Sequence, residues 1–150
     1  MIERATQSVN SQAIRKLLEG KKTRMKVCLA ACASCSLCAE SCFLYISNGR
    51  DPRYMPSYKV VNSLGILYRK KGKVSRADLE AMRDLVWHNC VLCGRCYCPF
   101  GIDIPYMISF ARRICRSQGI YGVYPHSVGA PEDDTLQGGS PTGGADGEQS

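Results

Sequence analysis

The fold is decided by the stretch Cys28-Leu-Ala-Ala-Cys32-Ala-Ser-Cys35-Ser-Leu-Cys38-Ala-Glu-Ser-Cys42. From Cys32 onward its cysteines follow the pattern C-x2-C-x2-C-x3-C, which is typical of a run that binds a 4Fe–4S cluster. A second, shorter run lies further along the chain, Cys90-Val-Leu-Cys93-Gly-Arg-Cys96-Tyr-Cys98-Pro99. Because nine of the ten cysteines lie in these two runs, we expect the rest of the chain to act mainly as their scaffold.

Apolar residues recur at helical spacing in four segments, and no segment alternates as a strand would. The predicted helices cover residues 10–20, 57–72, 75–88 and 103–119. Asp103 is a typical N-cap residue, and Ser75-Arg-Ala-Asp78 resembles a capping box with Asp in place of Glu. The basic residues Lys21, Lys22, Arg24 and Lys26 are expected to form a solvated segment. The sequence therefore predicts an all-α fold.

The residues between the ligands of the first run are small, namely Ala33, Ser34, Ser36, Ala39 and Ser41. Small side chains allow backbone N–H groups to approach the sulfurs of a cluster, which relieves its negative charge. Cys38 and Cys42 are four residues apart, so we expect them to share one face of a helix.

A rule from two-cluster ferredoxins predicts how the cysteines are divided. In those proteins the first three cysteines of a run bind one cluster and the fourth binds the other. The rule predicts one 4Fe–4S cluster bound by Cys32, Cys35, Cys38 and Cys98, and a second bound by Cys90, Cys93, Cys96 and Cys42. The least secure ligand is Cys98, because one residue separates it from Cys96 where the pattern has three. The alternatives are that Cys28 or Cys115 replaces Cys98, that one site holds a three-iron cluster, or that only one cluster is present.

Other interpretations of the cysteines are disfavoured. Zinc sites use two C-x2-C pairs, whereas three cysteines at x2 spacing suit an iron–sulfur cube better. The triplet Cys28-x3-Cys32-x2-Cys35 matches the motif of radical S-adenosylmethionine enzymes, but it continues directly into further cysteines. We expect Trp87 to pack in the core and His88 to lie at the surface rather than to bind metal.

The N-terminal sequence shows no apolar core of a secretory signal, and no apolar run is long enough to span a membrane. Ten cysteines without such a signal favour metal-bound thiols over disulfides. We therefore expect a cytoplasmic protein, free or peripheral to a membrane complex. The net charge is +7, but residues 126–150 contain five acidic and no basic residues, so residues 1–125 carry +12. Basic residues offset anionic clusters or attract an acidic redox partner, and we favour both roles over nucleic-acid binding.

Taken together, the motifs resemble a known family. Its members are similar to this chain in Cys32-x2-Cys35-x2-Cys38-x3-Cys42, Gly49-x-Asp-Pro52, Trp87-His-Asn-Cys90-Val-Leu-Cys93-Gly-Arg-Cys96 and Cys98-Pro-Phe-Gly-Ile-Asp103. The family is the helical dicluster module of heterodisulfide reductase iron–sulfur subunits, with relatives in glycolate oxidase and, more distantly, succinate dehydrogenase. The resemblance covers residues 28 to about 118. It implies an α-helical ferredoxin-like dicluster domain.

We expect three segments within the 150 residues. Residues 1–27 form an N-terminal helix and basic segment, residues 28–125 form the helical 4Fe–4S dicluster domain, and residues 126–150 form a disordered acidic, glycine-rich tail. A chain of this length allows one modest domain, and a bound cluster supplies folding free energy that a small apolar core lacks.

The resemblance implies an iron–sulfur subunit that relays single electrons through two 4Fe–4S clusters within a larger oxidoreductase complex. The partners it implies are a cysteine-rich reductase subunit, a flavoprotein or a membrane quinone subunit. We expect no catalytic site in this chain, because it shows no nucleophile–base pair and no nucleotide-binding motif. The alternative is a non-redox, cysteine-rich metal-binding module whose basic face binds protein or nucleic acid.

Overall fold

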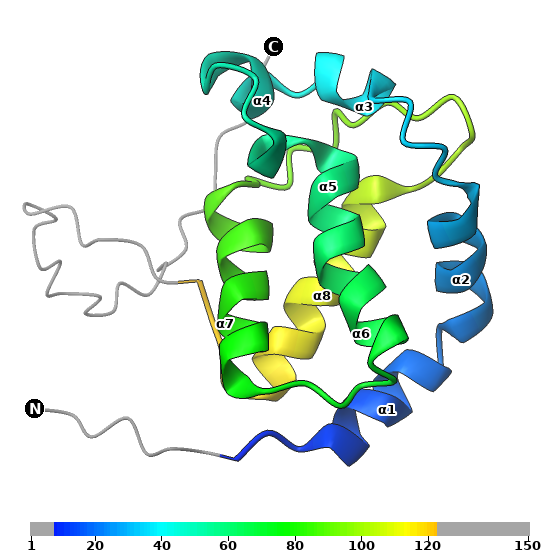
Figure 1. The fold of residues 1–150 in the computed structure, drawn as a ribbon, viewed down its shortest axis with the longest axis vertical. Helices are drawn as coiled ribbons and strands as arrows, with labels where there is room; N and C mark the ends of the chain where they lie inside the picture. The colour runs from blue at the N-terminus through cyan, green and yellow to red at the C-terminus, as the bar shows by residue number, and fades with distance from the viewer. Residues whose placement is uncertain (1–7, 123–150) are drawn as a thin grey trace, which may run out of the picture.

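The computed structural model describes residues 8–122, and every regular element in that range is a helix (Figure 1). The prediction of an all-α fold is therefore confirmed. The elements in chain order are α1 (Ser11–Glu19), α2 (Lys22–Ala31), α3 (Leu37–Glu40), α4 (Phe43–Ser47), the 3-10 turn η1 (Pro52–Tyr54), α5 (Pro56–Val60), the π-helical turn η2 (Val61–Gly65), α6 (Ile66–Arg69), α7 (Arg76–Arg83), the π-helical turn η3 (Asp84–His88) and α8 (Ile104–Ser117). The predicted tail of residues 126–150 lies outside the described residues.

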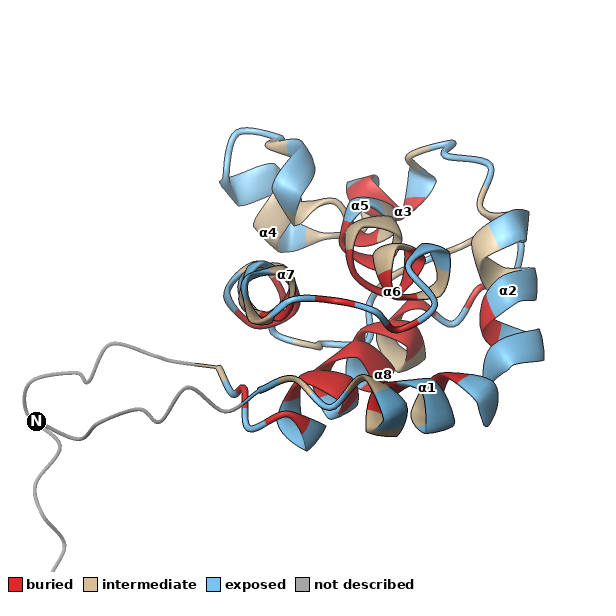
Figure 2. Cartoon of the chain, turned by 60° about the horizontal axis from the view of Figure 1, so that its bottom comes forward, coloured by how far each residue is buried: buried red, intermediate tan, exposed pale blue. Residues whose placement is uncertain are grey.

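The long helix α8 forms the centre of the fold. It packs against α1, α5 and α7, and its buried side faces these neighbours (Figure 2). The residues that fill this core include Ile14, Leu64, Leu67, Leu79, Met107, Ile108 and Ile114, all of which are almost completely buried. Since Ile14 belongs to α1, the N-terminal helix shares one core with the cysteine-bearing segments. The division of the chain at residue 28 stays a prediction.

The caps that the sequence predicts are present. The Asp103 carboxylate accepts a hydrogen bond from the Tyr106 backbone N–H at 3.0 Å, so α8 begins directly after it. Ser75 and Asp78 form the reciprocal capping box at the start of α7. Both caps satisfy backbone N–H groups that a helix start leaves without an intrahelical partner. These local interactions fix where the two helices begin.

The predicted helices 57–72 and 75–88 each contain a widened, π-helical turn. In the first of them, η2, the Ser63 hydroxyl donates a hydrogen bond to the Lys59 carbonyl at 2.6 Å. A π turn displaces the usual backbone pairing by one residue, and the hydroxyl pairs a buried carbonyl at this point. The wider turn changes which residues of the helix face the core without ending the helix.

The basic residues Lys21, Lys22, Arg24 and Lys26 are exposed, as predicted for a solvated segment, and most of them belong to a helix that was not predicted, because residues 22–31 form α2 with Met25 buried. One local prediction is wrong, because the segment from Cys38 to Cys42 is not one helix. Helix α3 ends at Glu40, and Cys42 has an extended backbone (φ −96°, ψ 106°) before α4 begins. The break between α3 and α4 turns Cys38 and Cys42 in different directions.

Candidate metal centres

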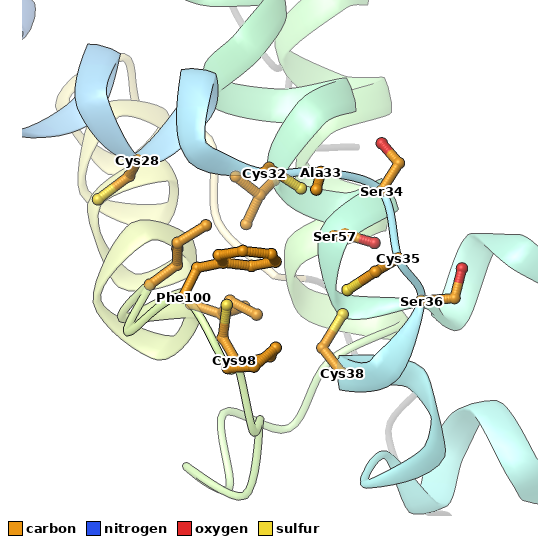
Figure 3. Close-up of a pocket in the computed structure, with 14 residues that line it drawn as sticks. Cys28, Cys32, Ala33, Ser34, Cys35, Ser36, Cys38, Ser57, Cys98 and Phe100 are labelled. Atoms are coloured by element: carbon orange, nitrogen blue, oxygen red, sulfur yellow. The ribbon is translucent and has the colours of Figure 1, made fainter.

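Nine cysteines line two pockets at the end of the fold that carries α3 and α4. The first pocket, called site 1, is lined by Cys28, Cys32, Cys35, Cys38 and Cys98 (Figure 3). The second, called site 2, is lined by Cys42, Cys90, Cys93 and Cys96. Every predicted ligand therefore lines a pocket, and the structure groups them as the ferredoxin rule groups them.

Each pocket takes cysteines from both runs. The break between α3 and α4 places Cys38 at site 1 and Cys42 at site 2. In the second run Cys96 lines site 2 and Cys98 lines site 1, although Tyr97 alone separates them. One intervening residue is therefore enough for the second run to reach both pockets.

The two runs share an unusual backbone conformation at equivalent positions. The residues before and after the central cysteine have left-handed φ angles in both runs, which are 53° at Ser34, 63° at Ser36, 55° at Leu92 and 77° at Gly94. Alternating right- and left-handed residues direct successive N–H groups into one concave space, which is a common way to bind an anionic centre. The Leu92 N–H already lies 3.4 Å from the sulfur of Cys90, to which it donates. Both loops thus have the backbone shape that an anionic iron–sulfur cluster requires.

The thiols of site 2 are close enough to influence one another. Burial, together with the neighbouring Cys90, Cys42 and Cys93, raises the pKa of Cys96 to about 12. Four thiolates without a counter-charge repel in such a site, whereas an iron cluster removes the protons and spreads the charge over the metal–sulfur core. No three His, Cys, Asp or Glu side chains in the described part of the chain converge on a single metal ion. The donor set fits a cluster with one thiolate at each iron.

The family follows from a comparison with known domains. Residues 31–103 match the model of the 4Fe-4S dicluster domain family. The chain contains a 4Fe–4S dicluster domain. Such a domain carries two 4Fe–4S clusters, so the predicted cofactors are confirmed.

Two curated proteins that are similar to this chain confirm the resemblance to heterodisulfide reductase-type iron–sulfur subunits. One is the Hdr-like menaquinol oxidoreductase iron-sulfur subunit of Archaeoglobus profundus, 31% identical over 114 residues, which are 67% of this chain and 20% of that protein. Another is the Hdr-like menaquinol oxidoreductase iron-sulfur subunit 2 of Archaeoglobus fulgidus, 27% identical over 123 residues, which are 73% of this chain and 22% of that protein. This chain therefore spans about a fifth of the length of these relatives. No solved structure matches it.

Helix α5 forms a wall shared by both sites of the dicluster domain. Ser57 and Val60 line site 1, whereas Lys59 lines site 2. Residues two apart on a helix point to nearly opposite sides, which explains how Ser57 and Lys59 reach different pockets. The same short helix therefore gives one site a hydroxyl and the other an ammonium group.

A buried arginine that the sequence did not single out supports site 2. The guanidinium of Arg112 on α8 donates hydrogen bonds to the Val86 carbonyl at 2.8 Å and to the Cys90 carbonyl at 2.5 Å. It also lies over the ring of Trp87, 5.3 Å from the ring centroid. Arg112 thus pairs two buried carbonyls at the point where the chain leaves η3 for the second run. The sequence signal that could have indicated its role is a basic residue on the apolar face of the predicted helix 103–119.

The remaining singled-out residues lie away from the two sites. Cys115 is completely buried, its thiol donates to the Leu79 carbonyl at 3.8 Å, and burial raises its pKa to about 12. It lines neither site, so of the two substitutes for Cys98 only Cys28 lies at site 1. Trp87 packs in the core as predicted, and His88 lies at the surface, 3.5 Å from the Asp84 carboxylate. Within the described residues, no helix combines the length and hydropathy needed to cross a bilayer.

Proposed function

We propose that this chain is an electron-transfer subunit that relays single electrons through its two clusters within a larger oxidoreductase complex. The observation that carries the proposal is the pair of adjacent cysteine-lined pockets, each of which takes thiols from both runs. A 4Fe–4S cluster accepts and donates single electrons without forming or breaking a bond to a substrate. Two such carriers on opposite sides of α5 give a path through the domain rather than a single storage site.

We propose the following ligands. Cys32, Cys35, Cys38 and Cys98 bind the cluster at site 1, and Cys42, Cys90, Cys93 and Cys96 bind the cluster at site 2. The directions of the side chains support Cys98 over Cys28, because the sulfur of Cys28 points away from the space toward which Cys35, Cys38 and Cys98 point (Figure 3). The left-handed residues beside Cys35 and Cys93 support a similar role for both central cysteines.

The chain's own residues hold the ligands and limit access of water. Site 1 is bordered by the apolar side chains of Val60, Ile102 and Ile104, and site 2 by Leu44, Leu92 and Ile108. A low dielectric around a cluster strengthens the interactions of its sulfurs with backbone N–H groups. Each cluster would therefore be shielded on the side that faces the core.

The other side of the sites supports docking of a redox partner. Large apolar side chains around the cysteine runs are about half exposed or more, namely Leu37, Phe43, Val91, Tyr97 and Phe100. Exposed apolar residues gathered on one side of a domain commonly mark a contact with another protein. Because the two relatives are named as subunits of a menaquinol oxidoreductase, we propose a partner of that class. It would be a cysteine-rich reductase subunit, a flavoprotein or a membrane quinone subunit, with this chain peripheral to the membrane complex.

Metal analysis of protein purified without oxygen tests the proposal. We expect about eight irons and eight sulfides per chain and two interacting paramagnetic centres after reduction. About four irons per chain with one such centre would show that the protein holds a single cluster, which excludes a relay through two clusters. A colourless protein that contains zinc alone would contradict the electron-transfer function altogether and support the non-redox metal-binding module.

Electron flow through the protein requires a second experiment. The chemically reduced protein is mixed with an oxidised quinone or flavoprotein acceptor, and the visible thiolate-to-iron absorption is followed. We expect this absorption to recover at a rate that rises with acceptor concentration. A variant in which Tyr97 is replaced by Glu, at the exposed surface between the two sites, should recover more slowly with unchanged iron content. Equal rates would contradict docking at this surface.

A further inference from the structure

Site 2 contains a buried lysine without an acidic partner among residues 8–122. Lys59 is 1% exposed and lines the pocket together with Cys42, Cys90, Cys93 and Cys96. No ion pair in this part of the chain includes its ammonium group. A buried cation without a counter-charge is costly, because the solvation that it loses is not replaced. An anionic cluster bound at site 2 would supply the missing counter-charge.

Lys59 is placed to act on the sulfurs of site 2. It lines that pocket together with the four cysteines Cys42, Cys90, Cys93 and Cys96. A positive charge buried beside these sulfurs stabilises the negative charge that a cluster distributes over them.

Site 1 offers no equivalent charge. Its lining consists of cysteines, serines, one alanine, one proline and apolar side chains, with no Lys, Arg, Asp or Glu. The residue of α5 that occupies the corresponding position is Ser57, which lines site 1. A hydroxyl is a neutral donor, and hydrogen bonds from a charged donor are roughly twice as strong as those from a neutral one. The two sites thus differ most in the residues contributed by their shared helix.

We propose that Lys59 raises the reduction potential of the cluster at site 2 above that of the cluster at site 1, so that the electron on a half-reduced protein resides at site 2. The inference rests on the proposed function, because it requires both clusters. Reduction adds one electron and one negative charge to the cluster, with no bond formed or broken and no proton transferred. A fixed positive charge stabilises the reduced form more than the oxidised form, and the chain thereby gives the relay a direction.

A purely structural role for Lys59 predicts a different result. The four-carbon stem could fill the core in the way that long basic side chains often do. In that case a neutral residue of similar length would preserve both potentials. The potential of each cluster therefore separates a tuning role from a packing role.

The experiment is a redox titration of the fully loaded protein, followed by the paramagnetic signals of the two clusters. In Lys59→Met, which removes the charge and keeps an unbranched side chain, we expect the midpoint of one cluster alone to fall. The electron affinity of that cluster should decrease about tenfold, which is about 59 mV for a one-electron couple. Lys59→Arg should retain most of the wild-type potential. Lys16→Met, which removes an exposed lysine of α1, should change neither midpoint.

Several outcomes overturn the inference. Unchanged midpoints in a fully loaded Lys59→Met protein would do so, and so would equal shifts in both clusters. If Lys59→Met loses iron, Lys59→Gln is titrated in its place, because it retains a neutral donor, and an unchanged midpoint in that variant also overturns the proposal. A failure of the proposed function is distinct, since it appears in the wild type as missing iron or missing paramagnetic signals.

Discussion

The Tyr97 backbone N–H donates a hydrogen bond of 3.1 Å to the hydroxyl of Ser41. Ser41 lies between Cys38 at site 1 and Cys42 at site 2, and Tyr97 lies between Cys96 at site 2 and Cys98 at site 1. The bond therefore joins the two runs at the points where each passes from one site to the other. The same hydroxyl donates to the Cys38 carbonyl at 3.0 Å, so one small side chain fixes both crossings.

Ser41→Ala should weaken the contact between the runs. The substitution leaves the Tyr97 N–H and the Cys38 carbonyl without this partner, so we expect the free energy of unfolding to fall by about 1 kcal/mol. Iron should also be lost faster in the presence of a chelator, because the positions of Cys42 and Cys98 depend on the contact. The matched control is Ser47→Ala, since Ser47 donates to the Leu44 carbonyl within its own exposed helix. Similar chelation rates for both variants would show that Ser41 does not hold the runs together.

Substitution of single cysteines should group the ligands by site. We expect Cys42→Ser to disturb the same paramagnetic signal as Cys93→Ser, and Cys98→Ser to disturb the same signal as Cys35→Ser, because a cluster with one altered ligand changes its own spectrum and potential. The measurement is the spectrum of each reduced variant together with its iron content.

Cys28→Ser is the matched control for Cys98→Ser, because both residues line site 1. We expect it to leave both signals and the iron content unchanged. If Cys28→Ser removes a signal and Cys98→Ser does not, Cys28 is the fourth ligand of site 1.

The sequence predicted the longest elements of the fold because they carry the strongest periodicity. Helix α8 and helix α1 each bury a continuous apolar stripe and begin at a polar cap, at Asp103 and Asn10 respectively. Helix α2 was missed because it buries Met25 alone and has no stripe. The π turns were also missed, because widening a turn shifts the pairing of the backbone without altering the apolar spacing by a recognisable amount.

The sequence also predicted which cysteines meet, but not what holds them. The spacing of the first run was enough to assign Cys32, Cys35 and Cys38 to one site, because three cysteines at x2 spacing can bind three irons of one cube. The supporting contacts of Arg112 and Lys59 depend on long-range packing of α8 and α5, which no local pattern reveals. The backbone angles that let Cys98 reach site 1 likewise depend on the contact of Tyr97 with Ser41.

Arg112→Met should destabilise the domain and affect site 2 first. The substitution removes the donors of two buried carbonyls, those of Val86 and Cys90, so we expect a loss of about 2–3 kcal/mol in the free energy of unfolding. The measurement is denaturant unfolding of the loaded protein, with iron release followed in parallel. Arg113→Met is the matched control, because Arg113 is the exposed neighbour on the same helix. A loss of equal size in the control would rule out the carbonyl contacts as the cause.

The capping box of α7 should make stability depend on pH in the acid range. The pKa of Asp78 is lowered from 3.8 to about 2, chiefly by the hydrogen bond from the Lys70 side chain and then by Ser75. A carboxyl whose folded pKa lies below its unfolded value stabilises the fold above the unfolded pKa, and this contribution is lost as the pH falls through the folded pKa. The difference in melting temperature between the wild type and Asp78→Asn should therefore shrink between about pH 4 and pH 2. A difference that stays constant over this range would contradict the assignment.

Ser75→Ala tests the other half of the capping box. It removes the hydroxyl that accepts from the Asp78 N–H at 3.1 Å, and N-cap substitutions of this kind cost about 1 kcal/mol. We expect thermal or denaturant unfolding at neutral pH to show this loss of stability. The iron content should stay unchanged, because α7 lines neither site. Loss of iron in this variant would show that α7 supports the clusters more directly than the contacts indicate.

The exchange of cysteines between the runs also has a consequence for how the protein is made. A ribosome releases Cys28 to Cys42 long before Cys90 to Cys98, yet each pocket is lined by thiols from both stretches. Neither metal centre has its full set of donors until the last cysteine of the second run has left the exit tunnel. We therefore expect cluster insertion only after the second run has been synthesised, and a chain truncated before Cys90 would present two incomplete sites rather than one complete site.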